Sequence, residues 1–138
     1  MHEDYITILA VGAFIINEKN ELLVVKKSPR ERIDPDLWTI PGGKIYPQEH
    51  IIDGLKREVL EEVGLNISSF QWIGEDVFEN QKAMHHAEHF LCKTKLAPIV
   101  LENKLTEYKW ITKLIDMEDL PFAVNIKKRI IEIFTKLI

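Results

Sequence analysis

The sequence contains a single cysteine, Cys92, among its 138 residues. One cysteine excludes an intramolecular disulfide and a zinc site made only of cysteines. Because Cys92 ends the apolar run His89-Phe90-Leu91-Cys92, we expect it to be a small buried hydrophobic residue.

The sequence also lacks the long apolar run of a membrane span, and the start Met1-His2-Glu3-Asp4 lacks the basic residues of a signal peptide. Eighteen basic and 22 acidic side chains give a net charge of −4 without a long basic run, which disfavours an extended nucleic-acid surface but not a nucleotide pocket. We therefore expect a cytoplasmic protein without a membrane partner. Its length indicates one domain over residues 1–138 and leaves homodimerisation open.

Short apolar segments separated by polar turns predict a β-sheet. The expected strands are residues 6–16, 22–26, 37–40, 66–79, 85–96 and 105–111. A C-terminal helix is predicted over residues 121–138, starting near Pro121. Strands interrupted by one central and one terminal helix predict an α/β fold, with a mixed sheet between two helices.

The central helix is predicted from about His50 to Val63, because apolar residues recur there every four positions. These residues are Ile51, Leu55, Val59 and Val63. Gly64 follows directly and is suited to a left-handed C-terminal cap. The helix should therefore bury one stripe and end at Gly64.

Three carboxylates gather on one side of this helix, at the edge of the buried stripe. Glu58, Glu61 and Glu62 fall within roughly a third of its circumference and lie toward its C-terminal end, where the helix dipole disfavours negative charge. Gly54 lies on the same side, which suggests that another group approaches the backbone there. Such a cluster of oxygen ligands suits Mg²⁺ or Mn²⁺.

The segment Pro41-Gly42-Gly43 precedes the helix and is predicted to turn tightly. Backbone amides of a glycine loop at a helix N-terminus can bind an anion such as phosphate. Phosphate binding next to a carboxylate cluster points to metal-assisted attack of water on a phosphoanhydride.

The stretch from Gly43 to Leu65 resembles the Nudix box. The matching positions are Gly43, then Glu49 after five residues, then after seven more the run Arg57 to Leu65. The resemblance implies a Nudix-type α/β/α sandwich. It also implies a Mg²⁺-dependent (or Mn²⁺-dependent) hydrolase that acts on a nucleoside diphosphate linked to another group.

The resemblance also implies roles for the residues of the box. Glu58 and Glu62 would be the main metal ligands, and Glu61 would share metal binding or orient a water. Glu49 would bind a further ion or accept a hydrogen bond from Arg57, whose guanidinium suits the orientation of carboxylates.

Substrate contacts are expected from Gly42, Gly43 and Lys44, of which only Lys44 carries a charge for phosphate. The general base would come from the box or from a loop outside it, which makes Glu107 a candidate. The alternative for Glu107 is an ordinary charge on an edge strand.

Three histidines, His85, His86 and His89, invite a zinc interpretation. In a strand, His85 and His89 share a face but lie roughly 13 Å apart, and His86 faces the other way, which disfavours zinc. A contact to the base or phosphate, or a plain surface position, fits these residues better.

The default substrate is a nucleoside triphosphate, because no pattern for a narrower Nudix branch is evident. A nucleotide-binding sensor without hydrolysis and an RNA 5′-pyrophosphohydrolase remain as alternatives. A Nudix-like isomerase acting on isoprenyl diphosphate is disfavoured, because it would need a catalytic cysteine near the box and Cys92 is distant.

Overall fold

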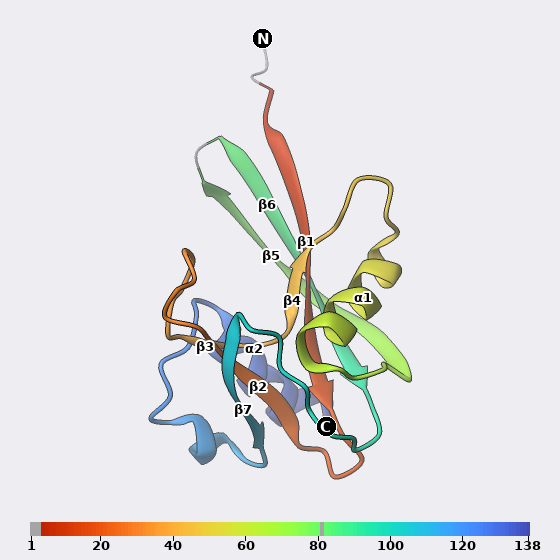
Figure 1. Ribbon diagram of the computed structural model, residues 1–138, viewed down its shortest axis with the longest axis vertical. Coiled ribbons are helices and arrows are strands. Elements are labelled where there is room, and N and C mark those ends of the chain that lie inside the picture. Colours follow the sequence, from red (N-terminus) through yellow and green to blue (C-terminus); the bar gives the residue numbers. More distant parts are fainter. Residues whose placement is uncertain (1–3, 81) are drawn as a thin grey trace.

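The computed structural model describes residues 4–80 and 82–138 and is built on one mixed β-sheet (Figure 1). Its central strand, β1 (Ile6–Ile16), pairs in parallel with β6 (Ala83–Lys93) along its whole length. The other edge of β1 pairs antiparallel with β4 (Gly42–Lys44) and, at its end, with β2 (Leu22–Lys27). The C-terminal half of β1 is buried on both faces, as predicted for a central strand.

The remaining strands extend the sheet outward on both sides. Strand β5 (Ser69–Asn80) pairs with β6, and β3 (Trp38–Thr39) and β7 (Leu105–Ile111) pair with β2. The long hairpin of β5 and β6 rises beside β1 in Figure 1. All six predicted strand segments are therefore present, and only their ends differ by a few residues. The short strand β4 was not predicted.

One helix covers each face of the sheet, so the predicted sandwich is confirmed. Helix α1 (Ile51–Val63) packs its apolar stripe on alternate residues of β1, and Leu55, Val59 and Val63 are fully buried there. Each fully buried side chain of this kind contributes about 1.5–3 kcal/mol. Cys92 lies in the same core, as predicted, and burial raises the pKa of its thiol to about 12.

Helix α1 also ends as expected. Gly64 has a φ of 73°, and its amide donates to the carbonyl of Leu60 at 3.0 Å. This left-handed cap favours glycine. It fixes the last turn of the helix, from which Glu61 and Glu62 project.

The C-terminal helix starts later than predicted. Helix α2 spans Ile126–Glu132 and continues as a π-helical turn, Ile133–Leu137, on the opposite face from α1. Residues 121–125 run irregularly because Phe122 forms a bridge with Trp38 and Asn125 has a φ of 69°. Among the described residues, no helix is long and apolar enough to span a membrane.

Candidate active site

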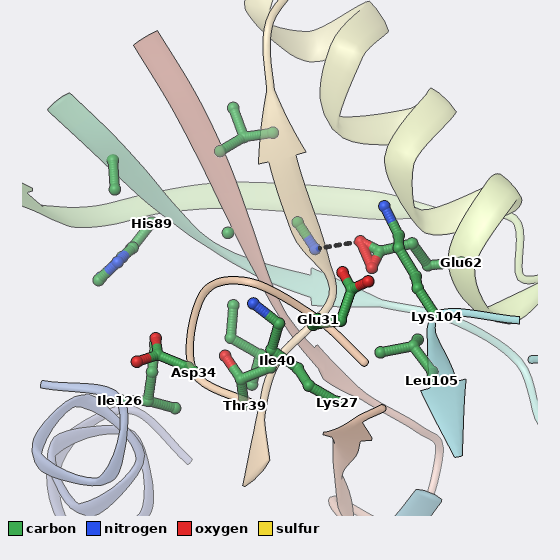
Figure 2. A pocket seen from close by; sticks show the side chains of 14 residues that line it. Lys27, Glu31, Asp34, Thr39, Ile40, Glu62, His89, Lys104, Leu105 and Ile126 are labelled. Carbon is green, nitrogen blue, oxygen red and sulfur yellow. Dashed lines mark hydrogen bonds between the residues drawn. The ribbon is translucent and has the colours of Figure 1, made fainter. Parts of the chain in front are cut away.

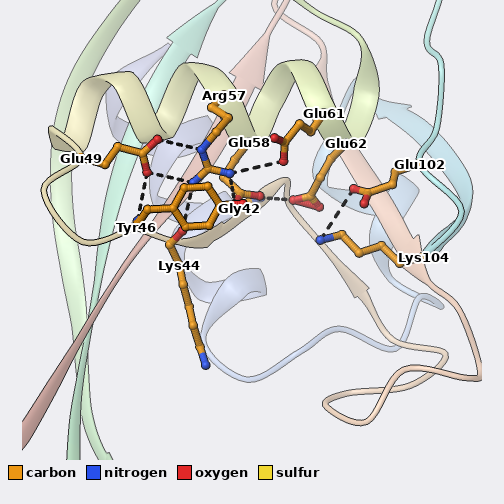
Figure 3. A network of polar contacts seen from close by, with 10 residues as sticks. All are labelled: Gly42, Lys44, Tyr46, Glu49, Arg57, Glu58, Glu61, Glu62, Glu102 and Lys104. Atoms are coloured by element: carbon orange, nitrogen blue, oxygen red, sulfur yellow. Dashed lines mark hydrogen bonds and ion pairs between the residues drawn. The ribbon is translucent and has the colours of Figure 1, made fainter.

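Arg57 holds three carboxylates of the site together (Figure 3). Its Nε and Nη2 donate to the two oxygens of Glu49 at 2.7 and 2.9 Å. Its Nη1 donates to Glu58 at 2.9 Å and to Glu61 at 3.3 Å, while Nη2 also reaches the carbonyl of Lys44 at 3.2 Å. The predicted contact between Arg57 and Glu49 is confirmed. Every nitrogen of the guanidinium is engaged, so Arg57 orients carboxylates.

Glu49 is the most firmly fixed of these carboxylates. It also accepts a hydrogen bond from the Tyr46 amide at 3.0 Å, and Arg57 stacks on the Tyr46 ring with its guanidinium carbon 3.8 Å from the centroid. The hydrogen bond from Arg57, and next that from the Tyr46 amide, lowers the pKa of Glu49 to about 2. A Cβ at Gly54 would lie 2.9 Å from Glu49 Oε1, which confirms the close approach expected at that glycine.

Glu62 projects from the last turn of α1 toward strand β4. Its side chain is buried, and its Oε1 accepts a hydrogen bond from the Gly42 amide at 2.9 Å. Burial raises the pKa of Glu62 to about 7, although the Gly42 hydrogen bond and the charge of Lys104 act in the opposite direction. A carboxylate this deeply buried needs a further positive partner to stay charged at neutral pH.

Gly42 and Gly43 lie in strand β4, so the predicted tight turn at the helix N-terminus is wrong. Their amides pair with β1 or bind Glu62, and the helix starts at Ile51, seven residues after the end of β4 at Lys44. The glycines instead permit close packing: a Cβ at Gly43 would lie 2.7 Å from the Glu58 carboxylate, and one at Gly42 would collide with the Val11 carbonyl.

The loop between β6 and β7 adds charges at the C-terminal end of α1. It runs along that end because the amides of Val100 and Glu102 donate to the carbonyls of Val63 and Glu62 at 3.0 and 2.9 Å. Lys104 Nζ then lies 3.6 Å from Glu102 Oε2, which has no hydrogen-bond donor within the described part of the chain. Burial lowers the pKa of Lys104, but the charges of Glu62 and Glu102 outweigh it and the pKa is raised.

Carboxylates outnumber cations around this end of α1. Among the described residues, the network in Figure 3 contains five carboxylates, those of Glu49, Glu58, Glu61, Glu62 and Glu102. The basic side chains that interact with them there are those of Arg57 and Lys104. Glu58 and Glu62, both buried, share the space beside β4. Oxygen ligands with excess negative charge fit a divalent metal such as Mg²⁺, which Glu58 and Glu62 would hold.

A cavity of about 240 Å³ opens next to this carboxylate cluster (Figure 2). Glu62 and Lys104 line one side, and Asp34 and His89 lie on the other. Gly42, whose amide binds Glu62, also lines the cavity. The cavity therefore joins a side with Glu62 and Lys104, suited to phosphate and metal, to a side where the Asp34 carboxylate and His89 lie near the apolar Ile126.

The three histidines do not converge on one point. His85 stacks on Phe78 at 4.7 Å, whereas His89 is buried and lines the cavity. His86 lies near Glu75 and Glu88, with ligand atoms within 4.8 Å of one another on the outer hairpin. Of the three, only His89 can reach a ligand in the cavity.

Two of the predicted site residues lie apart from the carboxylate cluster. Lys44 extends its side chain away from the network in Figure 3 and meets it only through its backbone carbonyl. Glu107 is exposed on β7 and pairs with Lys26 at 3.4 Å. The residues that sequence reasoning missed are Asp34, Glu102, Lys104 and Arg129. No local pattern marks them, because they reach the site only through long-range folding.

Three comparisons with known proteins agree with this geometry. A family model of the NUDIX domain matches residues 7–132. The crystal structure of the MutT protein from Methanosarcina mazei Go1 is 30% identical, with a TM-score of 0.78, over 98% of this chain and 100% of that chain.

Curated relatives match over shorter stretches. An 8-oxo-dGTP diphosphatase from Buchnera aphidicola is 43% identical over 67 residues, which cover 45% of this chain and 53% of that protein. The m7GpppN-mRNA hydrolase NUDT17 from Bos taurus is 31% identical over 74 residues, 52% of this chain and 24% of that protein. The chain thus spans about half or less of the length of these relatives.

Proposed function

Because this chain belongs to the NUDIX domain family, we propose that it is a Mg²⁺-dependent pyrophosphohydrolase of a nucleoside diphosphate linked to another group. Cleavage between the α and β phosphates would release a nucleoside monophosphate and the phosphorylated remainder. The observation that carries the proposal is the buried pair Glu58 and Glu62 beside β4, of which Glu62 lines the charged side of the cavity.

Each residue of the site has a separate role in this reaction. Glu58 and Glu62 hold the metal, and Arg57 and the Gly42 amide orient these two carboxylates. A bound Mg²⁺ supplies charge neutralisation for the diphosphate and lowers the pKa of the attacking water. Lys104 is placed to meet phosphate oxygens at the cavity wall.

The proton of the attacking water passes to a carboxylate near the metal. Glu61 is half-exposed, and within the described part of the chain its carboxylate accepts one hydrogen bond, of 3.3 Å from Arg57, so it is free to turn toward that water. Glu107 remains the alternative base, although its side chain pairs with Lys26 on β7.

A nucleoside triphosphate is the substrate class we propose. The cavity of about 240 Å³ is small beside the ~300–1,000 Å³ typical of drug-sized ligands, so it fits one base with its sugar. The Buchnera relative, named as an 8-oxo-dGTP diphosphatase, supports this class. The NUDT17 relative, named as an mRNA hydrolase, supports RNA 5′-pyrophosphohydrolysis as the second candidate.

A panel assay tests the proposal. Nucleoside triphosphates, ADP-ribose, a dinucleoside polyphosphate, and capped or triphosphorylated RNA are incubated with the protein, with and without Mg²⁺. Phosphate release is measured with added pyrophosphatase for the triphosphate substrates and with added phosphatase for ADP-ribose, the dinucleoside polyphosphate and capped RNA. We expect metal-dependent hydrolysis of a nucleoside triphosphate. Preference for RNA would select the second candidate, and tight binding without turnover would select a sensor and overturn the proposal.

A further inference from the structure

His89 separates two hollows of the molecule. It lies on β6, opposite Gly12 of β1, with only 4% of its surface exposed and its ring edge-on to Phe14 at 5.1 Å. It lines both the cavity beside Glu62 and a neighbouring polar hollow that also contains Arg129. The two edges of its ring therefore face two different environments.

The edge toward the polar hollow is occupied by Arg129 of α2. Arg129 Nε lies 3.2 Å from His89 Nδ1. A guanidinium can only donate hydrogen bonds, so Nδ1 must be the acceptor. Burial, and next the charge of Arg129, lowers the pKa of His89 to about 4, which keeps the ring neutral at neutral pH. A neutral imidazole with an accepting Nδ1 carries its proton on Nε2.

Arg129 is itself held on several sides. Its Nη1 donates to the Ile73 carbonyl at 3.3 Å and to both oxygens of Glu132 at 3.1 and 3.2 Å. It packs against the backbone of Gly74, where a Cβ would lie 2.6 Å from Nη2, and Gly74 has a φ of 145° at a bulge in β5. These contacts keep the donor aimed at His89.

The other edge of His89 faces the cavity. A Cβ at Gly12, which lines that cavity, would lie 2.8 Å from Ile40 Cδ1, 3.3 Å from His89 Cδ2 and 3.9 Å from Nε2, so the Cδ2–Nε2 edge of the ring lies beside Gly12 and Ile40 at the cavity wall. Figure 2 shows Asp34 on the same side of the cavity as His89 and away from Glu62. Asp34 has a φ of 50° and presents a carboxylate, which can only accept hydrogen bonds when ionised.

We propose that His89 donates from Nε2 to a carbonyl of the nucleobase while Asp34 accepts the neighbouring ring N–H, so that the site selects oxo bases over amino bases. Guanine, hypoxanthine and uracil present a carbonyl beside an N–H. Adenine and cytosine present an amino group beside a ring nitrogen with a lone pair. The amino group would place a donor opposite the Nε2–H donor of His89, and the ring nitrogen would place an acceptor opposite the Asp34 carboxylate, so neither hydrogen bond could form. Arg129 is a positioning residue, because it acts through His89. The inference rests on the proposed nucleotide hydrolase.

Binding of inosine and adenosine monophosphates to the full chain, measured by calorimetry, tests this directly, because these ligands differ only at the two recognised positions. We expect inosine monophosphate to bind at least tenfold more tightly. His89→Leu should bring the ratio close to one, and His89→Gln, which keeps a donor, should retain part of it. Lys128→Met, an exposed change in the polar hollow next to Arg129, should leave the ratio unchanged.

Nitrogen-15 NMR of His89 in the unmodified protein gives a readout that does not require any variant to fold. We expect the neutral Nε2–H tautomer in the unmodified protein at pH 7, and a shift toward the other tautomer or the charged ring in Arg129→Met. A proton on Nδ1 in the unmodified protein, or equal binding of the two monophosphates, would overturn the inference.

The two proposals fail separately. Hydrolysis of triphosphates with a base preference that His89→Leu leaves intact would reject the role of His89 alone. Selective binding of inosine monophosphate without any metal-dependent hydrolysis would reject the hydrolase proposal and keep the base site. Absence of binding for both monophosphates would reject the base site.

Discussion

The amide of Gly42 in β4 donates to Oε1 of Glu62 in α1 at 2.9 Å, across 20 residues of sequence. This contact joins the strand before the box helix to its last turn and aims a buried carboxylate at the cavity. It also places Glu62 in a site that disfavours its own charge, since its pKa is raised to about 7 mainly by burial. The same carboxylate is thus a proposed metal ligand and, through burial of its charge, destabilises the fold at neutral pH when no cation is bound.

The substitution Glu62→Gln separates these two properties. The amide keeps the shape and an acceptor for Gly42 but removes the charge. We expect kcat/KM to fall by on the order of 100-fold or more, since outer contacts alone cost 10–100-fold, while the melting temperature stays equal or rises. Glu118→Gln, an exposed change, is the control. Near-full activity of Glu62→Gln would remove Glu62 from the metal site.

Stability of the metal-free protein should depend on pH through Glu62. Its carboxyl binds protons more tightly when folded, because burial raises its pKa from an ordinary value of 4.5 to about 7. At Glu62 the folded state therefore holds more protons between these values, so the contribution of this residue to stability falls as pH rises from about 4.5 to 7 and then levels off. His89, whose pKa is lowered to about 4, acts in the opposite direction between pH 4 and about 6.5, so the contribution of Glu62 is measured as the difference between the unmodified protein and Glu62→Gln. The change is roughly 3 kcal/mol at most. Urea midpoints at pH 5 and pH 8 measure it.

Two controls assign that dependence. Glu62→Gln should become more stable relative to the unmodified protein as pH rises from 5 to 8, and saturating Mg²⁺ should stabilise the unmodified protein more at pH 8 than at pH 5, because the cation competes with the proton for Glu62. The lowered pKa of Glu49 acts in a separate window, since its contribution is lost only as pH falls below 4.5 toward 2. A stability difference between Glu62→Gln and the unmodified protein that stays constant from pH 5 to 8 without metal would contradict the assignment.

The substitution Arg57→Lys tests the orientation of the carboxylates. An ammonium cannot reproduce the fork that binds both oxygens of Glu49 together with Glu58. We expect kcat to fall 10- to 100-fold and the pKa of Glu49 to rise, as measured by steady-state kinetics and carboxyl-selective NMR titration. Lys56→Arg, an exposed change one residue away, should leave both unchanged. Unchanged kcat in Arg57→Lys would show that the fork is dispensable.

Local patterns in the sequence predict the parts of the site that lie on helix α1. The apolar stripe of α1, its Gly64 cap and the carboxylates at its edge all follow from helical spacing, and the structure confirms the elements that these patterns predict. Arg57 and Glu49 are eight residues apart in the sequence, and their contact could also be predicted from it.

Other parts depend on contacts that no local pattern encodes. Glu102 and Lys104 belong to a loop that reaches the site through backbone bonds to the end of α1. The late start of α2 follows from the bridge between Phe122 and Trp38, which overrides the start signal of Pro121. His89 was one of three equivalent histidines in the sequence, and only its pairing with Gly12 and Arg129 distinguishes it.

Two glycine substitutions should separate activity from stability. In Gly43→Ala the new Cβ would lie 2.7 Å from the Glu58 carboxylate, without a backbone conformation that excludes alanine, so Glu58 must move. We expect a loss of roughly 100-fold in kcat/KM with little change in melting temperature, because a misplaced reacting group costs far more than a small shift in packing.

Gly64→Ala should do the opposite. Its φ of 73° strains any residue with a Cβ, so unfolding should become easier by about 1 kcal/mol while the carboxylates keep their positions. Parallel thermal melts and kinetics of the two variants make the comparison. If Gly43→Ala retained full activity, the close packing of β4 on Glu58 would serve the fold alone, and the metal site would have to be sought nearer Glu61.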